Sequence, residues 1–403
     1  MKRIGKMVIG IYCSLMLLGG IGVASGEEEM ETVTVIPHTY KDLTVGYKEL
    51  PQDMTRFYYN SGYQFAYPED GVKGVYVTGH SAGGEKFQEL IDLIQSTELN
   101  AMVIDIKDDY GNLTFLPPEE MNVPDIGKNM IRDPVKMMDV LEEHEIYPIA
   151  RIVVFKDTVL AEKKPEWSFT ENGSVWKNGR GEAFVNPYVK DVWDYNVKIA
   201  EEAAKLGFKE IQFDYVRFPE GFETRDEILE YSRGDYAEEE NRVTQRVTAV
   251  TDFVHYAYEK LTSKYDVDIS VDIFGYAATI DEAPGIGQNF AKISEHVDVI
   301  SSMIYPSHWT PYFGLDKPDL YPYELTKAYA EVEKEVLAQL DDPPVSRPWI
   351  QDFTASWLGA GNYKKYGVKE VEEQIRALNE AGIHEFLLWN AANRYTKGVD
   401  YTP

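Results

Sequence analysis

The feature that most constrains this chain is a series of apolar, strand-like runs that recur from residue 72 to the C-terminus. Each run is rich in β-branched and aromatic residues and has the length of a single buried strand. Eight strands are therefore predicted: Val72–Thr78, Ala101–Lys107, Tyr147–Phe155, Glu210–Phe218, Asp268–Phe274, Val297–Tyr305, Val345–Phe353 and Glu385–Asn390.

Amphipathic segments separate these runs and predict helices between the strands. Eight strands alternating with helices indicate an α/β protein with a closed parallel (β/α)8 barrel, the TIM-barrel architecture. No glycine fingerprint for a dinucleotide follows any strand, which argues against an open doubly wound sheet. The predicted helices are Lys86–Ile94, Pro134–His144, Val189–Leu206, Val243–Leu261, Tyr323–Leu340 and Val368–Asn379, with a short one around 287–295.

The two ends of the chain depart from a bare barrel. Basic residues at positions 2, 3 and 6 precede an apolar run, Met7–Val23, and small residues follow it, which is the order of a secretory signal. We therefore expect a secreted or extracytoplasmic protein, attached to a membrane only if this segment stays uncleaved. About a dozen residues follow the eighth strand, so we expect the N-terminal arm to cover that strand's outer face. The predicted regions are a signal peptide or anchor at 1–25, an arm or linker at 26–68 and the barrel at 69–403.

Composition narrows the classes of partner. The chain has 68 acidic and 40 basic residues, and its formal net charge of -28 repels phosphate backbones, so no nucleic-acid partner is expected. The one cysteine, Cys13, lies in the N-terminal apolar run, which leaves the barrel without disulfides or cysteine metal sites. Aromatic residues make up 13% of the chain, more than a core alone tends to need, and both sugar-stacking surfaces and tight packing account for them. Trp309, Trp357 and Trp389, at or just after predicted strand ends, are candidates to stack on sugar rings, and core packing accounts equally well for Trp389. No cofactor and no metal are predicted.

Polar residues stand near the carboxyl ends of successive predicted strands, where barrel active sites gather. Two carboxylates flanking one bond are the minimum for glycoside hydrolysis. Asp214 and Asp272 belong to adjacent strands, whose backbones run about 4.8 Å apart, and this allows carboxyl groups about 5–5.5 Å apart, the retaining geometry. We predict that Asp214 is the nucleophile, held ionised by Arg217 or Arg151, and that Asp272 is the acid and base.

Further strand-end residues are predicted to contact a sugar substrate. Strand alternation places Asp105 and Lys107 on one face, as it does Gln212 with Asp214. Asp105 and Asp352 are the substitutes should Asp272 not serve as the acid, and an Asp–Arg network that merely holds strand ends together is the structural alternative. The predicted substrate-binding residues are Asp105, Lys107, Arg151, Gln212, Arg217, Tyr305, His308, Trp309, Asp352 and Asn390.

Long motifs lie at or near the predicted strand ends, in the runs 75–79, 104–109, 150–157, 211–219, 271–276, 303–308 and 347–353, among them Gln212-Phe213-Asp214-Tyr215-Val216-Arg217-Phe218-Pro219. These motifs resemble those of a bacterial family of glycoside-hydrolase-like domains of unknown function. The resemblance covers nearly everything from residue 70 to the C-terminus and implies a glycosidase-like TIM barrel acting on an oligo- or polysaccharide. In the wider superfamily a fourth-strand Asp is commonly the nucleophile, and Asp214 occupies that position.

Three competing interpretations remain open at this point. The run 79–83 has the G-x-S-x-G pattern of a serine esterase with Ser81 as nucleophile and His308 or His384 as base, although it lies on the first strand. A barrel that binds carbohydrate without catalysis would keep the cleft but show no turnover. The acidic cluster Asp105, Asp108 and Asp109 could hold Ca²⁺, but its spacing does not match the EF-hand loop, and a solvated rim is the simpler interpretation.

Overall fold

The structure is a computed structural model that describes residues 44–49 and 55–403, with side chains from residue 58 onwards. All eight predicted strands are present, and they run parallel. The seventh is divided into two short pieces by Arg347 and Pro348. The strands are β3 Lys73–Val77, β4 Ala101–Lys107, β5 Tyr147–Val153, β8 Glu210–Asp214, β9 Asp268–Phe274, β10 Val299–Met303, β11 Val345–Ser346 with β12 Trp349–Gln351, and β13 Phe386–Trp389.

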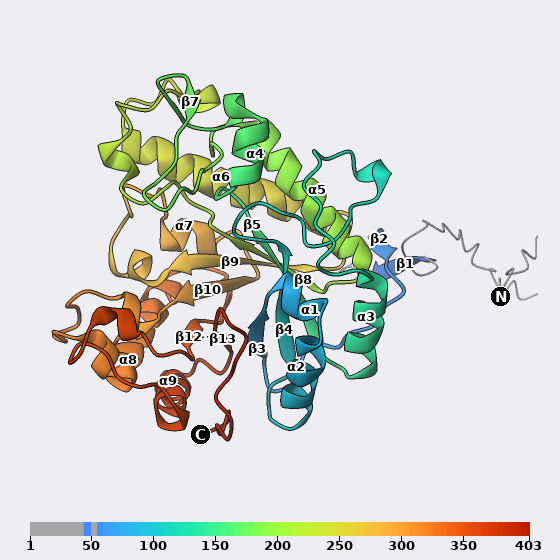
Figure 1. Cartoon of the computed structure of the whole chain (residues 1–403), viewed down its shortest axis with the longest axis vertical. Coiled ribbons are helices and arrows are strands. Elements are labelled where there is room, and N and C mark those ends of the chain that lie inside the picture. Colours follow the sequence, from blue (N-terminus) through green and yellow to red (C-terminus); the bar gives the residue numbers. More distant parts are fainter. Residues whose placement is uncertain (1–43, 50–54) are drawn as a thin grey trace, which may run out of the picture. The chain divides into compact units, whose positions relative to one another are not determined.

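These strands close into a barrel. The hydrogen-bonded order is β3, β4, β5, β8, β9, β10, β12, β13 and back to β3. Closure is made by β13 with β3, through the pairs Phe386 with Lys73 and Leu388 with Val75. The predicted (β/α)8 barrel is therefore confirmed, and in Figure 1 the strands occupy the centre with the long helices outside them.

The helices lie where the amphipathic segments predicted them. Their ends follow local rules: α5 stops at Gly207, whose φ of 105° is open to glycine, and α6 begins after Asn241, whose side chain accepts from two backbone N–H groups. The helices are α1 Gly79–Ala82, α2 Lys86–Gln95, α3 Pro134–Glu143, α4 Thr158–Lys163, α5 Lys190–Leu206, α6 Arg242–Thr262, α7 Phe290–Ser294, α8 Pro322–Leu337 and α9 Val368–Ala381. The structure also has two small antiparallel ribbons, β1 Thr44–Glu49 with β2 Thr55–Asn60 and β6 Thr170–Glu171 with β7 Ser174–Val175, and several 3-10 turns in the loops.

Strand alternation divides the buried residues into two sets. Outward-facing side chains such as Ile104, Phe213 and Val271 belong to the large core shared with the helices. A smaller apolar cluster, including Val103, Ile149 and Leu387, lies among the inward-facing positions. Most other inward positions on β8, β9 and β10 are polar, so these strands contribute buried polar groups to the barrel interior.

The covering of the eighth strand differs from our expectation. The outward residues Phe386 and Leu388 of β13 are buried, and the ring of Phe386 stacks at 6.5 Å on that of Tyr401. Among the described residues, the C-terminal tail therefore supplies this contact. The arm instead pairs at Tyr59 with Tyr265, next to the start of β9. A tail of a dozen residues suffices because three of its side chains, Tyr395, Val399 and Tyr401, turn inward.

The predicted signal or anchor at 1–25 lies outside the described residues. Within the described part of the chain, no helix has the length and apolar character needed to cross a membrane.

Candidate active site

A buried arginine organises the carboxyl end of the barrel. Arg151 of β5 donates from Nε and Nη2 to Asp214 Oδ2, at 3.0 and 2.5 Å, and from Nη1 to Asp105 Oδ1 at 2.6 Å. Its Nη2 also contacts Asp109 Oδ1 at 2.8 Å. The guanidinium lies 5.4 Å from each of the Tyr76 and Trp389 ring centres, which hold its plane by cation–π contact. One cation therefore holds three carboxylates.

Strand register explains how these residues meet. Asp105 of β4 pairs directly with Arg151 of β5, and Arg151 pairs with Gln212 of β8. Asp214 follows Gln212 by two residues, so both point into the barrel. The long Arg151 side chain extends towards the carboxyl end of the barrel, where its guanidinium contacts the Asp214 carboxylate.

Asp272 reaches the same place from β9. The register pairs Phe213 with Val271, so Asp214 and Asp272 follow as neighbours at the top of adjacent strands. Asp272 is 1% exposed, and its Oδ1 accepts a hydrogen bond of 2.7 Å from Trp349 Nε1. Burial, and then the charge of Asp214, raise the pKa of Asp272 well above its usual range, against a smaller lowering by Arg151. The site thus holds an arginine-paired carboxylate beside one that favours its protonated form.

The chain turns sharply immediately after Asp214. Tyr215 has a φ of 52°, a left-handed conformation that is a genuine outlier for a bulky side chain. This conformation aims the Tyr215 backbone N–H at Asp214 Oδ1, at 2.5 Å. Each oxygen of Asp214 therefore has a donor, from Arg151 on one side and from the backbone on the other.

A cleft of about 710 Å³ opens over these groups and is lined by both Asp214 and Asp272. Its volume lies within the range of small-molecule and sugar sites. Aromatic side chains form much of its wall, and prominent among them are Tyr276, Tyr305, Trp309, Tyr312, Trp349 and Trp389.

Seven predicted site residues line this cleft: Arg151, Asp214, Arg217, Asp272, Tyr305, His308 and Trp309. Of the two arginines considered as partners of Asp214, Arg151 makes the contact. Arg217 instead donates to the Phe218 carbonyl at 3.1 Å and to Glu220 at 3.2 Å. Tyr305 is buried at the base, whereas His308 lies at the exposed mouth.

Lys107 lies outside the cleft, contrary to our expectation. The register between β4 and β5 shifts after Asp105, so that Lys107 pairs with Ile152 and joins the outward-facing set. A β-bulge of this kind inverts the alternation on which the prediction rested. Lys107 Nζ contacts Asp157 at 2.6 Å and Asn196 of α5 at 3.0 Å, fully buried between strand and helix.

Four other predicted substrate contacts do not line the cleft. Asp105 is 3% exposed and is engaged by Arg151 and by the Tyr76 hydroxyl at 2.5 Å. Gln212 lies deeper in the barrel, near Ser301. Asp352 accepts from the backbone and hydroxyl of Thr396, and Asn390 donates to the Asp352 carbonyl, so this pair secures the C-terminal segment rather than a ligand. Asp352 is thereby removed as a substitute acid.

The geometry also bears on the serine-esterase alternative. The Ser81 hydroxyl lies 3.1 Å from that of Thr78, within the single turn α1. Within the described residues, His308 pairs with Ser307 and His384 with Asn379, and no histidine hydrogen bond reaches Ser81. Without a base on the hydroxyl, the G-x-S-x-G match is a local turn rather than an activated nucleophile.

Four further side chains complete the site: Tyr76, Asp109 and Trp389 contact Arg151, and Trp349 contacts Asp272. Tyr76 and Trp349 were not predicted as site residues. Strand alternation on the first strand could have identified Tyr76, because a tyrosine between Val75 and Val77 points inward. Asp109 was noted only as part of an acidic cluster, because the strand pattern does not predict the path of the loop after β4. In the described part of the chain, no group of three or more His, Cys, Asp or Glu side chains is arranged to hold a metal.

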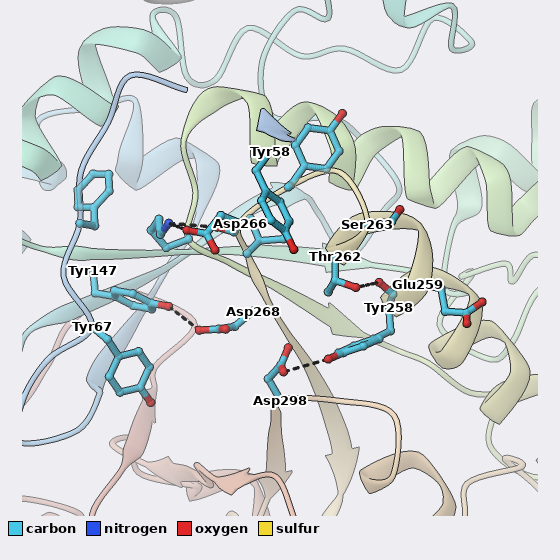
Figure 2. A pocket seen from close by; sticks show the side chains of 14 residues that line it. Tyr58, Tyr67, Tyr147, Tyr258, Glu259, Thr262, Ser263, Asp266, Asp268 and Asp298 are labelled. Carbon is cyan, nitrogen blue, oxygen red and sulfur yellow. Dashed lines mark hydrogen bonds and ion pairs between the residues drawn. The ribbon is translucent and has the colours of Figure 1, made fainter. Parts of the chain in front are cut away.

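A second hollow, of about 850 Å³, lies at the opposite, amino end of the barrel. Figure 2 shows its lining, in which tyrosines face the carboxylates. The Tyr147 hydroxyl donates to Asp268 at 3.2 Å and that of Tyr258 to Asp298 at 3.4 Å. Active sites of parallel barrels lie at the carboxyl end, and the cleft over Asp214 is therefore the better candidate.

A closed (β/α)8 barrel with an acidic pair under an aromatic cleft at its carboxyl end defines a protein of the glycosidase class. A family model described as "putative glycosyl hydrolase domain" matches residues 74–395. The chain belongs to this family, and its class of activity is the hydrolysis of oligo- or polysaccharides.

One solved structure supports this barrel, and a second is similar in sequence over about half of the chain. The glycoside hydrolase domain of PgaB (BpsB) from Bordetella bronchiseptica matches 80% of this chain and 94% of its own, at 14% identity and a TM-score of 0.54, which supports the fold. A hypothetical protein from Ruminiclostridium thermocellum is 33% identical over 49% of this chain and 96% of its own, with a TM-score of 0.42. A comparison with curated protein sequences finds no match.

Proposed function

We propose that this protein is a retaining glycosidase that cleaves an extracellular or cell-envelope glycan, with Asp214 as nucleophile and Asp272 as acid and base. The observation that carries the proposal is the contrast between the two carboxyl groups. They lie at the ends of adjacent strands under one cleft, yet only Asp214 is paired with an arginine. Two carboxyl groups in environments as different as these can divide the acid and nucleophile roles.

The surroundings of Asp214 fit a nucleophile. Arg151 Nη2 lies 2.5 Å from Asp214 Oδ2, and this ion pair holds that oxygen in place. The Tyr215 N–H holds the other oxygen, so the carboxylate has one orientation below the cleft. A nucleophile that is fixed in place loses little entropy when it attacks.

The surroundings of Asp272 fit a general acid. Its carboxyl has no cation partner among the described residues, and its hydrogen bond comes from the neutral Trp349 indole. Burial and the nearby charge of Asp214 raise its pKa, so that the group retains a proton to give to a leaving oxygen.

The reaction then follows two balanced steps. In the first, the Asp272 proton passes to the glycosidic oxygen as the bond from that oxygen to the anomeric carbon breaks, and an Asp214 oxygen bonds to that carbon. In the second, Asp272, now ionised, takes a proton from water while the water oxygen replaces Asp214 on the anomeric carbon. The product keeps the anomeric configuration of the substrate, and Asp272 ends protonated as it began.

The place of action rests on the N-terminal sequence. The basic, apolar and small-residue order of residues 2–26 favours export. Glycans of the cell envelope or of the extracellular matrix are the substrates that an exported glycosidase meets.

The decisive experiment is turnover of an array of cell-wall and exopolysaccharide fragments by the wild type and three variants. Asp214→Asn and Asp272→Asn should each reduce kcat/KM at least about 10³-fold with the fold retained. Asp268→Asn is the matched control, because it lies on the same strand as Asp272 but at the other end of the barrel, and it should keep activity.

Two further readouts separate the roles. A substrate with a leaving group that needs no proton should restore the first step in Asp272→Asn but not in Asp214→Asn. In the wild type, kcat/KM should fall as the pH rises through the raised pKa of Asp272, and this basic limb should disappear in Asp272→Asn.

Absence of turnover in the wild type across the array would favour a carbohydrate-binding barrel without catalysis, and inversion of configuration would exclude Asp214 as nucleophile.

A further inference from the structure

Trp357 is a large aromatic side chain that the barrel core does not use. It lies in the single helical turn Ser356–Leu358 after β12, and it is 65% exposed. Its ring stacks on that of Phe353, with centres 5.8 Å apart and planes 19° from parallel. Because one face of the indole is occupied by Phe353, the exposed area lies mainly on the opposite face and on the edge.

This exposed ring is continuous with the catalytic cleft. Phe353 is 6.1 Å from Tyr305, and Tyr305 is 6.2 Å from Trp389. Tyr305 and Trp389 both line the cleft over the carboxylates. His308, also part of the cleft lining, presents its ring at 6.5 Å from Trp357 and at 77° to it. A row of aromatic rings thus leads from Asp272 to the outer surface, which distinguishes Trp357 from a scattered surface hydrophobe.

The loop that carries Trp357 is held in place. Leu358 N–H donates to the Ala355 carbonyl at 3.1 Å, and the Asn362 amide donates to the Leu358 carbonyl at 3.0 Å. Lys317, from the preceding barrel loop, donates to the Gly361 carbonyl at 2.9 Å. The ring is therefore presented in a fixed position, and a ligand that stacks on it loses little loop entropy.

We infer that Phe353, Trp357 and His308 form an outer sugar platform, a distal subsite for a further sugar unit of the glycan whose scissile bond lies at Asp214 and Asp272. Pyranose rings present an apolar face of C–H groups, which packs on an aromatic face, and hydroxyl groups at the rim, which the imidazole of His308 can bond. The platform makes the protein selective for chains long enough to span from the carboxylates to Trp357. This inference rests on the proposed function for the position of the scissile bond.

The test is binding of cello- and chito-oligosaccharides, from disaccharide to hexasaccharide, measured by calorimetry on protein carrying Asp272→Asn to suppress turnover. Trp357→Ala should weaken binding of the hexasaccharide about tenfold and leave disaccharide binding unchanged, while Trp357→Phe should retain most of the affinity. Leu116→Ala is the matched control, because Leu116 is also exposed, at 60%, but adds no ring to this row, and it should bind as the parent does.

Equal hexasaccharide affinity in the parent and Trp357→Ala would overturn the platform, as would an equal loss for the disaccharide. Absence of binding by every oligosaccharide, together with self-association that Trp357→Ala abolishes, would overturn it in favour of a contact between copies of the chain. Failure of the proposed function is separate, since it appears as absence of turnover by the wild type, whereas failure of the platform appears in the affinities alone.

Discussion

Two of the buried arginines, Arg151 and Arg347, lie at opposite ends of the barrel, and they differ in what surrounds them. At the carboxyl end, Arg151 faces three aspartates. At the amino end, Arg347 donates to both oxygens of Glu210, at 2.8 and 2.6 Å, and to Glu385 at 2.7 Å, and Tyr67 completes its hydrogen bonds. Each arginine is held by several carboxylate oxygens, so the ion pairs alone do not distinguish a site from a structural brace.

The difference lies in access and in the balance of charge. Arg347 and Glu210 are fully buried, and this cluster belongs to the packed floor of the barrel. The Arg151 cluster opens into the cleft, and Asp272 adds a carboxyl group beside it that no cation neutralises in the described part of the chain. A carboxyl group that lines a cleft without a cation partner, rather than a buried ion pair as such, marks the functional end.

Replacing each arginine in turn should give the largest effects and tests whether Arg347 acts in stability and Arg151 in function. Arg347→Met should lower the free energy of unfolding by about 3–5 kcal/mol, because it leaves Glu210 buried without its partner. The rate per folded molecule should stay that of the wild type, since the cluster lies at the far end of the barrel. Arg151→Met should instead abolish turnover at a temperature where the variant is still folded. Urea unfolding measures the stability, and glycan turnover measures the activity. A loss of turnover in folded Arg347→Met would show that the amino-end cluster is not purely structural.

The two ends also differ in how far the sequence predicted them. Apolar periodicity identified all eight strands, and barrel topology then placed Asp214, Asp272 and Arg151 at one end. The amino-end cluster was missed, because Glu210 and Arg347 are more than a hundred residues apart and a Glu at a strand start carries no signal of its partner. Only the closed barrel brings them together.

Strand alternation predicted the wrong face for the Lys107 side chain. A one-residue bulge after Asp105 sends its side chain to the outer face, and nothing in the run Ile104-Asp105-Ile106-Lys107 indicates it. Hydrophobic pattern predicts which strands exist, but local irregularities near strand ends decide which side chains reach the cleft, and these depend on loop contacts that the pattern does not contain.

Asp105, another of the carboxyl groups that contact Arg151, should make the free energy of unfolding depend on pH. Burial, partly opposed by Arg151, raises the pKa of Asp105 from 3.8 to about 6. The folded state therefore binds this proton more tightly than the unfolded state, so the stabilisation is complete below about pH 4 and is lost as the pH rises through 6. Asp105→Asn should remove this slope, which amounts to about 2–3 kcal/mol between pH 4 and 7.

The measurement is the free energy of unfolding of the wild type and Asp105→Asn at several pH values, compared as a difference so that other titrating groups cancel. At low pH the variant should be less stable than the wild type, because an amide replaces the Asp105 carboxyl that contacts Arg151 and Tyr76. Its free energy of unfolding should nevertheless change less with pH. Parallel curves for the two proteins would mean that Asp105 titrates in the folded state as it does in the unfolded chain.

The smallest expected effect concerns backbone strain, which the carboxyl end contains next to its proposed nucleophile. Tyr215 adopts a φ of 52°, whereas Arg347, Glu210, Glu385 and Tyr67 of the amino-end cluster do not take positive φ values. Tyr215→Ala and Tyr215→Gly remove the same phenol ring and differ only in the Cβ atom. If the left-handed turn is strained, the glycine variant should be the more stable of the two by about 1 kcal/mol, because glycine adopts this φ without steric cost.

Elsewhere in a chain alanine is favoured over glycine by a similar amount, through the entropy of the unfolded state. The order of the two unfolding free energies therefore reports directly on the strain, and an alanine variant more stable than the glycine variant would show that the turn holding the N–H on Asp214 is relaxed.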